Sequence, residues 1–111
     1  MKVTYYKSIN ENKENRVEYC LQNFDYEDGN DYLAKIFQKE FGMEIEEKVD
    51  YIYFSIIKVR LDNKEYEMLW HEDTGNCIYA INQDEASDRK LEEMLNTVLE
   101  ILNRELEHKQ L

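Results

Sequence analysis

The chain has 111 residues, of which 42% are hydrophobic and 13% aromatic, and its net charge is −11. This length suits one domain over residues 1–111, and the apolar and aromatic content excludes a disordered chain. Without a Lys/Arg cluster, direct binding to DNA or RNA and to an anionic membrane surface is disfavoured, because such binding depends on cationic contacts to phosphates.

The N-terminal segment carries strand patterns. Residues 3–9 are rich in β-branched and aromatic side chains, which predict a strand. After a polar turn, residues 16–22 alternate apolar and polar side chains and predict a returning strand. The apolar residues of 16–24 also recur at helical spacing, so strand and helix both remain open for this segment.

A helix is well marked over residues 31–41, DYLAKIFQKEF, whose apolar side chains form a stripe. Asp28 or Asn30 is expected to cap its start, and Gly42 to end it in a left-handed conformation. Residues 43–50 are expected to form a short extended connection or an edge strand.

The middle of the chain predicts an antiparallel meander. Residues 51–61, YIYFSIIKVRL, give the strongest strand signal, and their apolar run up to Ile57 predicts burial on both faces of the first half. Short polar turns then separate this strand from EYEMLWH, residues 65–71, and from CIYAIN, residues 77–82. Connections this short join antiparallel neighbours.

The period becomes helical from about Asp84, where leucine, methionine, valine and isoleucine recur every three or four residues. This pattern predicts a long amphipathic helix of roughly six turns. Both helices must bury their stripes against the sheet. The expected fold is therefore α+β with two layers: an antiparallel β-meander of about four to six strands, packed by a short central helix and a long C-terminal amphipathic helix.

The stretch LWHEDTGNCIYAI, residues 69–81, collects side chains that metal sites and nucleophilic sites use. His71 and Cys77 stand six positions apart without the second Cys/His pair that a zinc site requires. Glu72 and Asp73 would disfavour a reactive thiolate at Cys77. Gly75 suits a turn, so a hairpin explains the stretch more simply. We expect no catalytic residue, no metal and no cofactor, and hence no enzyme, although a site assembled only in space stays open.

The chain carries no sequence signal for export or for a membrane span. Its N-terminus lacks an apolar segment, and no apolar run approaches the roughly 20 residues that a span requires. Two cysteines are too few for a disulfide scaffold. These features together predict a cytoplasmic protein with no membrane contact.

In size, charge and layout, the chain resembles small acidic bacterial immunity proteins of contact-dependent and polymorphic toxin systems. The resemblance covers residues from about 30 to 108 and includes the meander around KVRLDNKEYEMLWHEDTGNCIYAI. It implies a protein that binds and neutralises a basic toxin, with a nuclease favoured, and it carries over no individual functional residue.

Charge itself predicts where such a partner would bind, because acidic surfaces steer basic proteins. The alternative is a structural or regulatory interaction module, either a monomer or a homodimer that pairs through an exposed sheet face or edge. The predicted partner-binding residues precede the first helix or lie at the second hairpin turn: Asp25, Tyr26, Glu27, Asp28, Asp31, Glu72 and Asp73.

Overall fold

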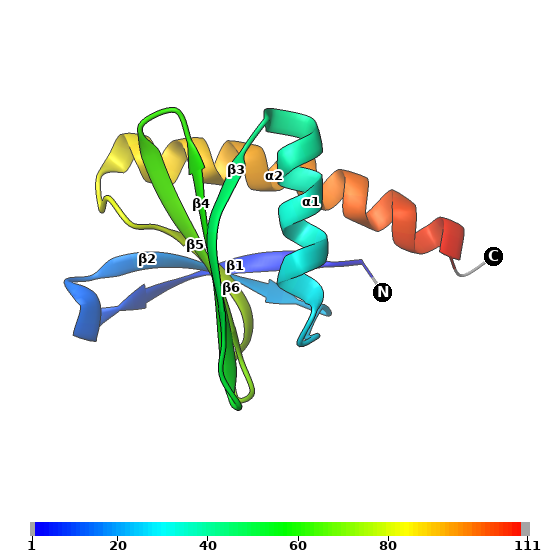
Figure 1. Cartoon of the computed structure of the whole chain (residues 1–111), viewed down its shortest axis with the longest axis horizontal. Helices are drawn as coiled ribbons and strands as arrows, with labels where there is room; N and C mark the ends of the chain where they lie inside the picture. Colours follow the sequence, from blue (N-terminus) through cyan, green and yellow to red (C-terminus); the bar gives the residue numbers. More distant parts are fainter. Residues whose placement is uncertain (1, 110–111) are drawn as a thin grey trace.

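The computed structural model describes residues 2–109 and shows a six-stranded antiparallel sheet packed by a short helix and a long C-terminal helix (Figure 1). This architecture confirms the predicted two-layer α+β fold. The strands are β1 (Thr4–Asn10), β2 (Arg16–Gln22), β3 (Glu44–Asp50), β4 (Phe54–Leu61), β5 (Lys64–His71) and β6 (Gly75–Ala80). The helices are α1 (Gly29–Phe41), α2 (Glu85–Lys109) and the short 3-10 turn η1 (Glu11–Lys13).

The strand order is β1-β2-β6-β5-β4-β3, so β3 to β6 form the meander and the β1–β2 hairpin joins it beside β6. Of the two structures expected for residues 16–24, strand or helix, the strand is the one that forms, because β2 pairs with both β1 and β6. The β1–β2 hairpin lies crosswise to β3, β4 and β5 (Figure 1).

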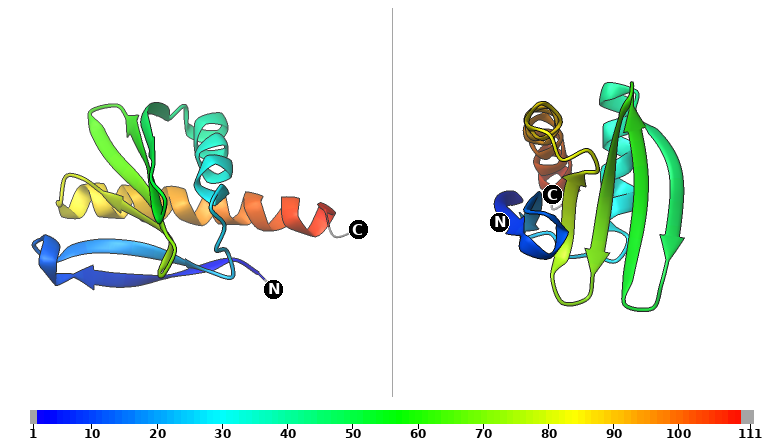
Figure 2. Two further views of the ribbon diagram at one scale, coloured as in Figure 1. Left: turned by 60° about the horizontal axis from the view of Figure 1, so that its bottom comes forward. Right: turned by 90° about the vertical axis from the view of Figure 1, so that its left-hand side faces the viewer.

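Both helices cover the same face of the sheet, and the core lies between them and the strands (Figure 2). Leu33 and Phe37 of α1 and Leu91 and Leu95 of α2 are fully buried there. The opposite face, called the open face below, carries one row of side chains in register across the strands: Tyr6, Cys20, Cys77, Leu69, Ile56 and Val49.

The expectation of a strand buried on both faces from residue 51 was wrong for its first residues. β4 begins at Phe54, and residues 51–53 form the turn between β3 and β4, where Ile52 is 85% exposed. Because β3 pairs antiparallel with β4 up to Asp50 and Ser55, the chain has to reverse between these residues. The N–H of Tyr51 donates to the carbonyl of Phe54 at 2.8 Å and closes the turn.

The helix ends follow the expected signals in part. Gly42 adopts the left-handed conformation (φ 72°) after α1, as predicted. Asp28 occupies the N-cap position of α1, but its side chain makes no capping hydrogen bond. At α2, the Asp84 carboxylate accepts from the Ser87 N–H at 2.7 Å, and this bond holds the pKa of Asp84 below its usual value.

Edge strand β1 is tied to α2 through polar side chains. The hydroxyl of Tyr5 donates to the Glu92 carboxylate at 2.6 Å, and the Lys7 ammonium lies 3.0 Å from the same carboxylate. The Tyr5 hydrogen bond is the main cause that lowers the pKa of Glu92. Asn103 adds a reciprocal pair of hydrogen bonds to the backbone of Val3.

Replacing Glu92 by Gln should destabilise the protein by about 1 kcal/mol at about pH 7, because the partly exposed charged contacts to Tyr5 and Lys7 are lost. A lowered folded-state pKa means that Glu92 contributes stability above its unfolded pKa of about 4.3, and that this contribution disappears as pH falls through the folded pKa. Urea unfolding should therefore show a difference at about pH 7 that is smaller at about pH 3.

The matched control for this prediction is Glu93→Gln, which changes an exposed neighbour on the same helix. It should leave the free energy of unfolding nearly unchanged at both pH values. A Glu92→Gln effect of equal size at both pH values would contradict the electrostatic explanation.

Candidate functional site

Three connecting segments meet at one end of the sheet: residues 25–28, the β3–β4 turn at 51–53, and the β5–β6 turn at 72–74. They are called the loop end below. The N–H of Glu72 donates to the carbonyl of Tyr53 at 2.9 Å, and the indole N–H of Trp70 donates to the Asp25 carboxylate at 3.1 Å. Both hairpin turns lie at the same end of the molecule (Figure 2). Segments far apart in sequence therefore form one surface.

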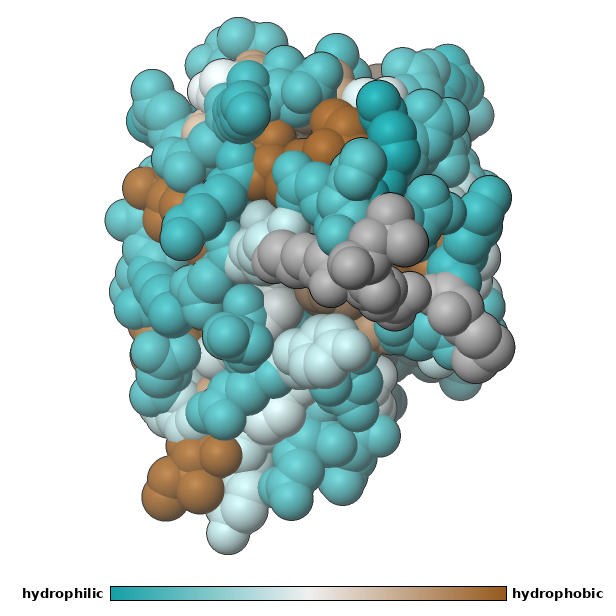
Figure 3. All heavy atoms as spheres, turned by 90° about the vertical axis from the view of Figure 1, so that its right-hand side faces the viewer, coloured by the Kyte–Doolittle hydropathy of each residue, from teal (hydrophilic) through white to brown (hydrophobic). Residues whose placement is uncertain are grey.

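Large apolar and aromatic side chains are exposed at the loop end. Ile52 is 85% exposed, Tyr53 62%, Tyr26 55% and Tyr51 54%. In the space-filling view, hydrophobic atoms protrude at the lower tip of the molecule, where the β3–β4 turn lies (Figure 3). Aromatic side chains of this kind dominate the energy of protein–protein contacts, so the loop end is a candidate binding surface.

The β3–β4 turn is supported by a stack of rings. Tyr51 stacks on Phe54 with ring centroids 4.4 Å apart, and Phe54 stacks in turn on His71 at 6.4 Å. The Nδ1 atom of His71 accepts the N–H of Asp73 at 3.0 Å. His71 therefore shapes the β5–β6 turn, which fits the hairpin interpretation of residues 69–81.

Residues 25–28 are fastened to the sheet by the buried side chain of Asn76 on β6. Its Oδ1 accepts the N–H of Tyr26 at 3.1 Å, and its Nδ2 donates to the Asn30 side chain at 3.0 Å and to the Tyr26 carbonyl at 3.3 Å. These bonds fix the backbone of Tyr26 while its ring remains exposed. Preorganisation of this kind reduces the entropy lost on binding.

The structure brings most of the predicted partner-binding residues together. Asp25, Tyr26 and Asp73 line a shallow hollow of about 410 Å³. Glu72 follows the same turn beside Tyr53. Glu27 and Asp28 are exposed on the segment that carries Tyr26.

Asp31 differs from the other predicted residues. It lies in the first turn of α1, where its carboxylate contacts the ammonium of Lys48 on β3 at 2.7 Å. This contact raises the pKa of Lys48 and neutralises much of the Asp31 charge. Asp31 therefore helps to hold α1 against the sheet edge and adds little negative potential to the loop end.

Sequence reasoning missed the exposed aromatic turn. Residues 51–53 contain none of the Gly, Asn, Asp or Pro residues that mark turns, and they continue into a true strand without a break in composition. Only the pairing of β3 with β4 reveals them as a turn. Asp50, directly before Tyr51, was the one local signal of a possible reversal.

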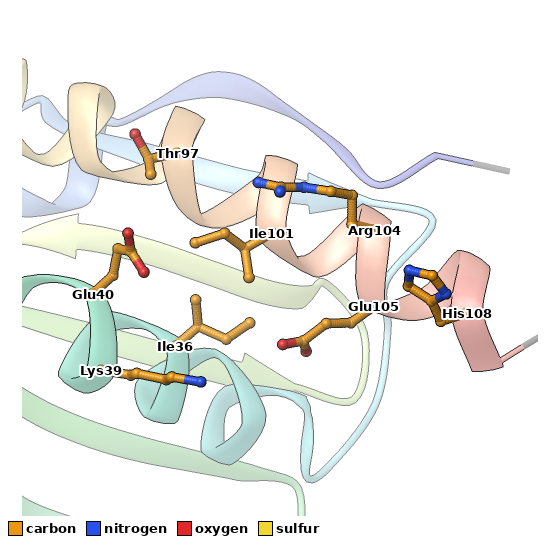
Figure 4. A pocket seen from close by; sticks show the side chains of 8 residues that line it. All are labelled: Ile36, Lys39, Glu40, Thr97, Ile101, Arg104, Glu105 and His108. Carbon is orange, nitrogen blue, oxygen red and sulfur yellow. The ribbon is translucent and has the colours of Figure 1, made fainter.

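A groove of about 460 Å³ separates α1 from α2 near the C-terminal part of α2 (Figure 4). Its charged side chains have both signs, since Lys39 and Arg104 alternate with Glu40 and Glu105. The Glu105 carboxylate also accepts the hydroxyl of Tyr32. The groove therefore offers neither a uniform potential nor a free carboxylate at Glu105 for a ligand.

Two further polar clusters lie outside the loop end. In the first, the ammonium of Lys64 lies 3.2 Å from the hydroxyl of Ser87, and this hydroxyl donates to the Asp84 carboxylate. Ser87 is fully buried, however, and belongs to the cap of α2. Cys20, Cys77 and Glu18 place three potential metal-ligand atoms within 4.8 Å of one another on β2 and β6. Neither cluster touches the loop end.

No protein-family model, curated protein or solved structure matches this chain. Among residues 2–109, the helices are too short or too polar to cross a bilayer. The resemblance to immunity proteins therefore stays a hypothesis, and the loop end is the feature on which a function can be argued.

Asn76→Ala should destabilise the protein by about 2 to 3 kcal/mol, because it leaves the N–H of Tyr26 and the Asn30 side chain without their buried partner. It should also release residues 25–28, which chymotrypsin would then cleave faster after Phe24 or Tyr26. Urea unfolding and limited proteolysis measure the two effects. Gln38→Ala, which removes an exposed amide from α1, is the control; equal behaviour of the two variants would contradict the role of Asn76.

Proposed function

We propose that this protein is a non-enzymatic inhibitor that binds a basic partner enzyme, as bacterial immunity proteins and antitoxins do. The observation that carries the proposal is the composition of the loop end. Four large apolar or aromatic side chains are exposed there, and two of its three segments carry five acidic residues: Asp25, Glu27, Asp28, Glu72 and Asp73. The three segments contain no Lys or Arg.

A toxin of the nuclease type is the favoured partner. A nuclease must bind phosphates, so the groove that holds its substrate is cationic. Carboxylates steer an acidic protein toward such a groove and raise the association rate. The exposed rings can then be buried in the contact and supply most of the affinity.

The loop end is also rigid enough for an inhibitor. The Asn76 hydrogen bonds, the Tyr51–Phe54 stack and the Glu72–Tyr53 hydrogen bond hold its three segments in one arrangement. Little ordering is then required when the partner binds. The proposed setting is the bacterial cytoplasm, where a toxin has to be neutralised.

An interaction module that forms a homodimer is the second candidate, and the open face favours it. Neither helix covers this face, and it carries the apolar row that includes Leu69, Ile56 and Val49. The outer edge of β3 is a poorer surface for pairing, because it is rich in glutamate and has a bulge between Ile45 and Glu47. Sedimentation separates the two candidates: a monomer at micromolar concentration argues against the dimer.

The direct test is coexpression with each basic protein that is encoded next to this chain's gene, followed by an assay of its nuclease or other enzymatic activity. We expect a stable complex and loss of the enzyme's activity. In that complex, Tyr53→Ala should weaken binding about tenfold or more, because it removes an exposed ring from the contact. Tyr6→Ala removes a ring from the open face, where Tyr6 is 49% exposed against 62% for Tyr53, and should change affinity little. Equal losses for the two variants, or no complex, would reject the proposed surface.

The contribution of the loop-end carboxylates to the association rate is tested with a second pair of matched variants. Glu72→Gln combined with Asp73→Asn should slow association and flatten its salt dependence. Glu93→Gln combined with Glu100→Gln changes the net charge equally, but on the exposed side of α2. If stopped-flow association rates fall equally in both double variants, steering comes from overall charge, and the loop end has no special part in it.

A further inference from the structure

The seam between β2 and β6 is the place where the β1–β2 hairpin joins the rest of the sheet. The two strands are in register only at Glu18↔Tyr79, Tyr19↔Ile78 and Cys20↔Cys77. By contrast, β4 and β5 are paired along their whole lengths. The hairpin therefore depends on a short seam that has cysteines at one end.

Cys20 and Cys77 lie directly opposite each other across this seam, and their sulfur atoms are 3.0 Å apart. Opposed residues of antiparallel strands have Cα atoms about 4.5 to 5.5 Å apart. Disulfides accept Cα separations of about 4.4 to 6.8 Å. The two sulfurs can therefore be joined without moving the backbone.

The two thiols differ in reactivity. The hydrogen bond from the Cys77 thiol lowers the pKa of Cys20, whereas that shared hydrogen bond and burial raise the pKa of Cys77. Cys20 is 6% exposed and Cys77 3%, and the ring next to Cys20 on the open face is the half-exposed side chain of Tyr6. Both cysteines are buried, and Cys20, whose pKa is the lower, is the better nucleophile of the two.

Glu18 makes a metal site the competing explanation, because its carboxylate lies near both sulfurs. That carboxylate is already engaged: its Oε2 accepts from the Arg16 guanidinium at 2.6 Å and from the Asn10 amide at 3.0 Å. The same guanidinium lies 3.6 Å above the ring of Tyr79. A metal would have to compete with this arrangement and would find three protein ligands, fewer than a structural zinc site uses.

We propose that Cys20 and Cys77 are a modification site at which a small disulfide oxidant, such as oxidised glutathione, forms a reversible intramolecular disulfide. The Cys20 thiolate attacks one sulfur of the oxidant and releases one glutathione thiolate. The Cys77 sulfur then loses its proton, attacks the Cys20 sulfur of the mixed disulfide and releases the second glutathione. The protein gives up two electrons and two protons, and the oxidant takes them up as two thiols.

The bond fastens the β1–β2 hairpin covalently to β6. It closes a loop from residue 20 to residue 77, which restricts the unfolded chain and raises the midpoint of thermal unfolding by about 10 °C. In a reducing compartment the pair remains as two thiols. Oxidation would then switch the seam from hydrogen bonds alone to a covalent link.

The test equilibrates the full chain in glutathione buffers of increasing oxidised fraction, followed by acid quenching, alkylation and mass spectrometry. We expect an intact mass lower by two hydrogen atoms and a disulfide joining tryptic peptides 17–35 and 65–89. The thermal midpoint of the wild-type chain should rise on oxidation. Cys20→Ala and Cys77→Ala should show no such rise, and the peptide map of the wild-type chain decides the matter if either variant fails to fold.

Several results would overturn the proposal. Two alkylated cysteines in the most oxidising buffer would show that no bond forms. A stable glutathione adduct on Cys20, or a disulfide-linked dimer, would show that Cys77 does not resolve the intermediate. Stoichiometric zinc retained by the reduced chain and lost in Glu18→Gln would assign the cluster to a metal instead.

Discussion

The fold depends on one constraint: two amphipathic helices must bury their apolar stripes on the same face of a single sheet. Leu33 and Phe37 of α1 and Leu91 and Leu95 of α2 are fully buried in that layer, together with Tyr66 and Ile78 of the central strands. The burial of such side chains is the main free energy that opposes the entropy cost of ordering the chain. Everything that is not part of this layer, namely the open face, the strand edges and the loop end, is free to serve another role.

This division explains why the loop end differs from the other acidic surfaces. The outer side of α2 carries glutamates such as Glu93 and Glu100, which are typical of a solvated helix face. At the loop end, acidic residues share a surface with Ile52 and Tyr53, whose exposed side chains lower solubility and contribute little to the core. A surface that combines steering charge with exposed anchors has the composition of a contact site, whereas charge alone does not.

Much of the fold was predictable because it follows local periodicity. The stripe of α2, the left-handed Gly42 and the meander after residue 54 all depend on residues that are close in sequence. The turn at Tyr51 to Tyr53 was not predictable in this way, since its apolar composition matches the strand that follows and only the pairing with β3 reveals it. The separate role of Asp31 depends likewise on Lys48, which approaches through tertiary packing.

The contact between Cys20 and Cys77 shows the same limit more sharply. Neither residue belongs to a short motif, and each alone is typical of a small buried residue in a strand. They meet because the β1–β2 hairpin is inserted beside β6, out of sequence order, and because the register aligns them at the end of a short seam. A one-residue shift in that register would turn one sulfur toward the helices and separate the pair. The chemistry of this pair therefore follows from topology and register. The acidic and aromatic character of the loop end has the same kind of origin, because only the folded sheet brings its three segments together.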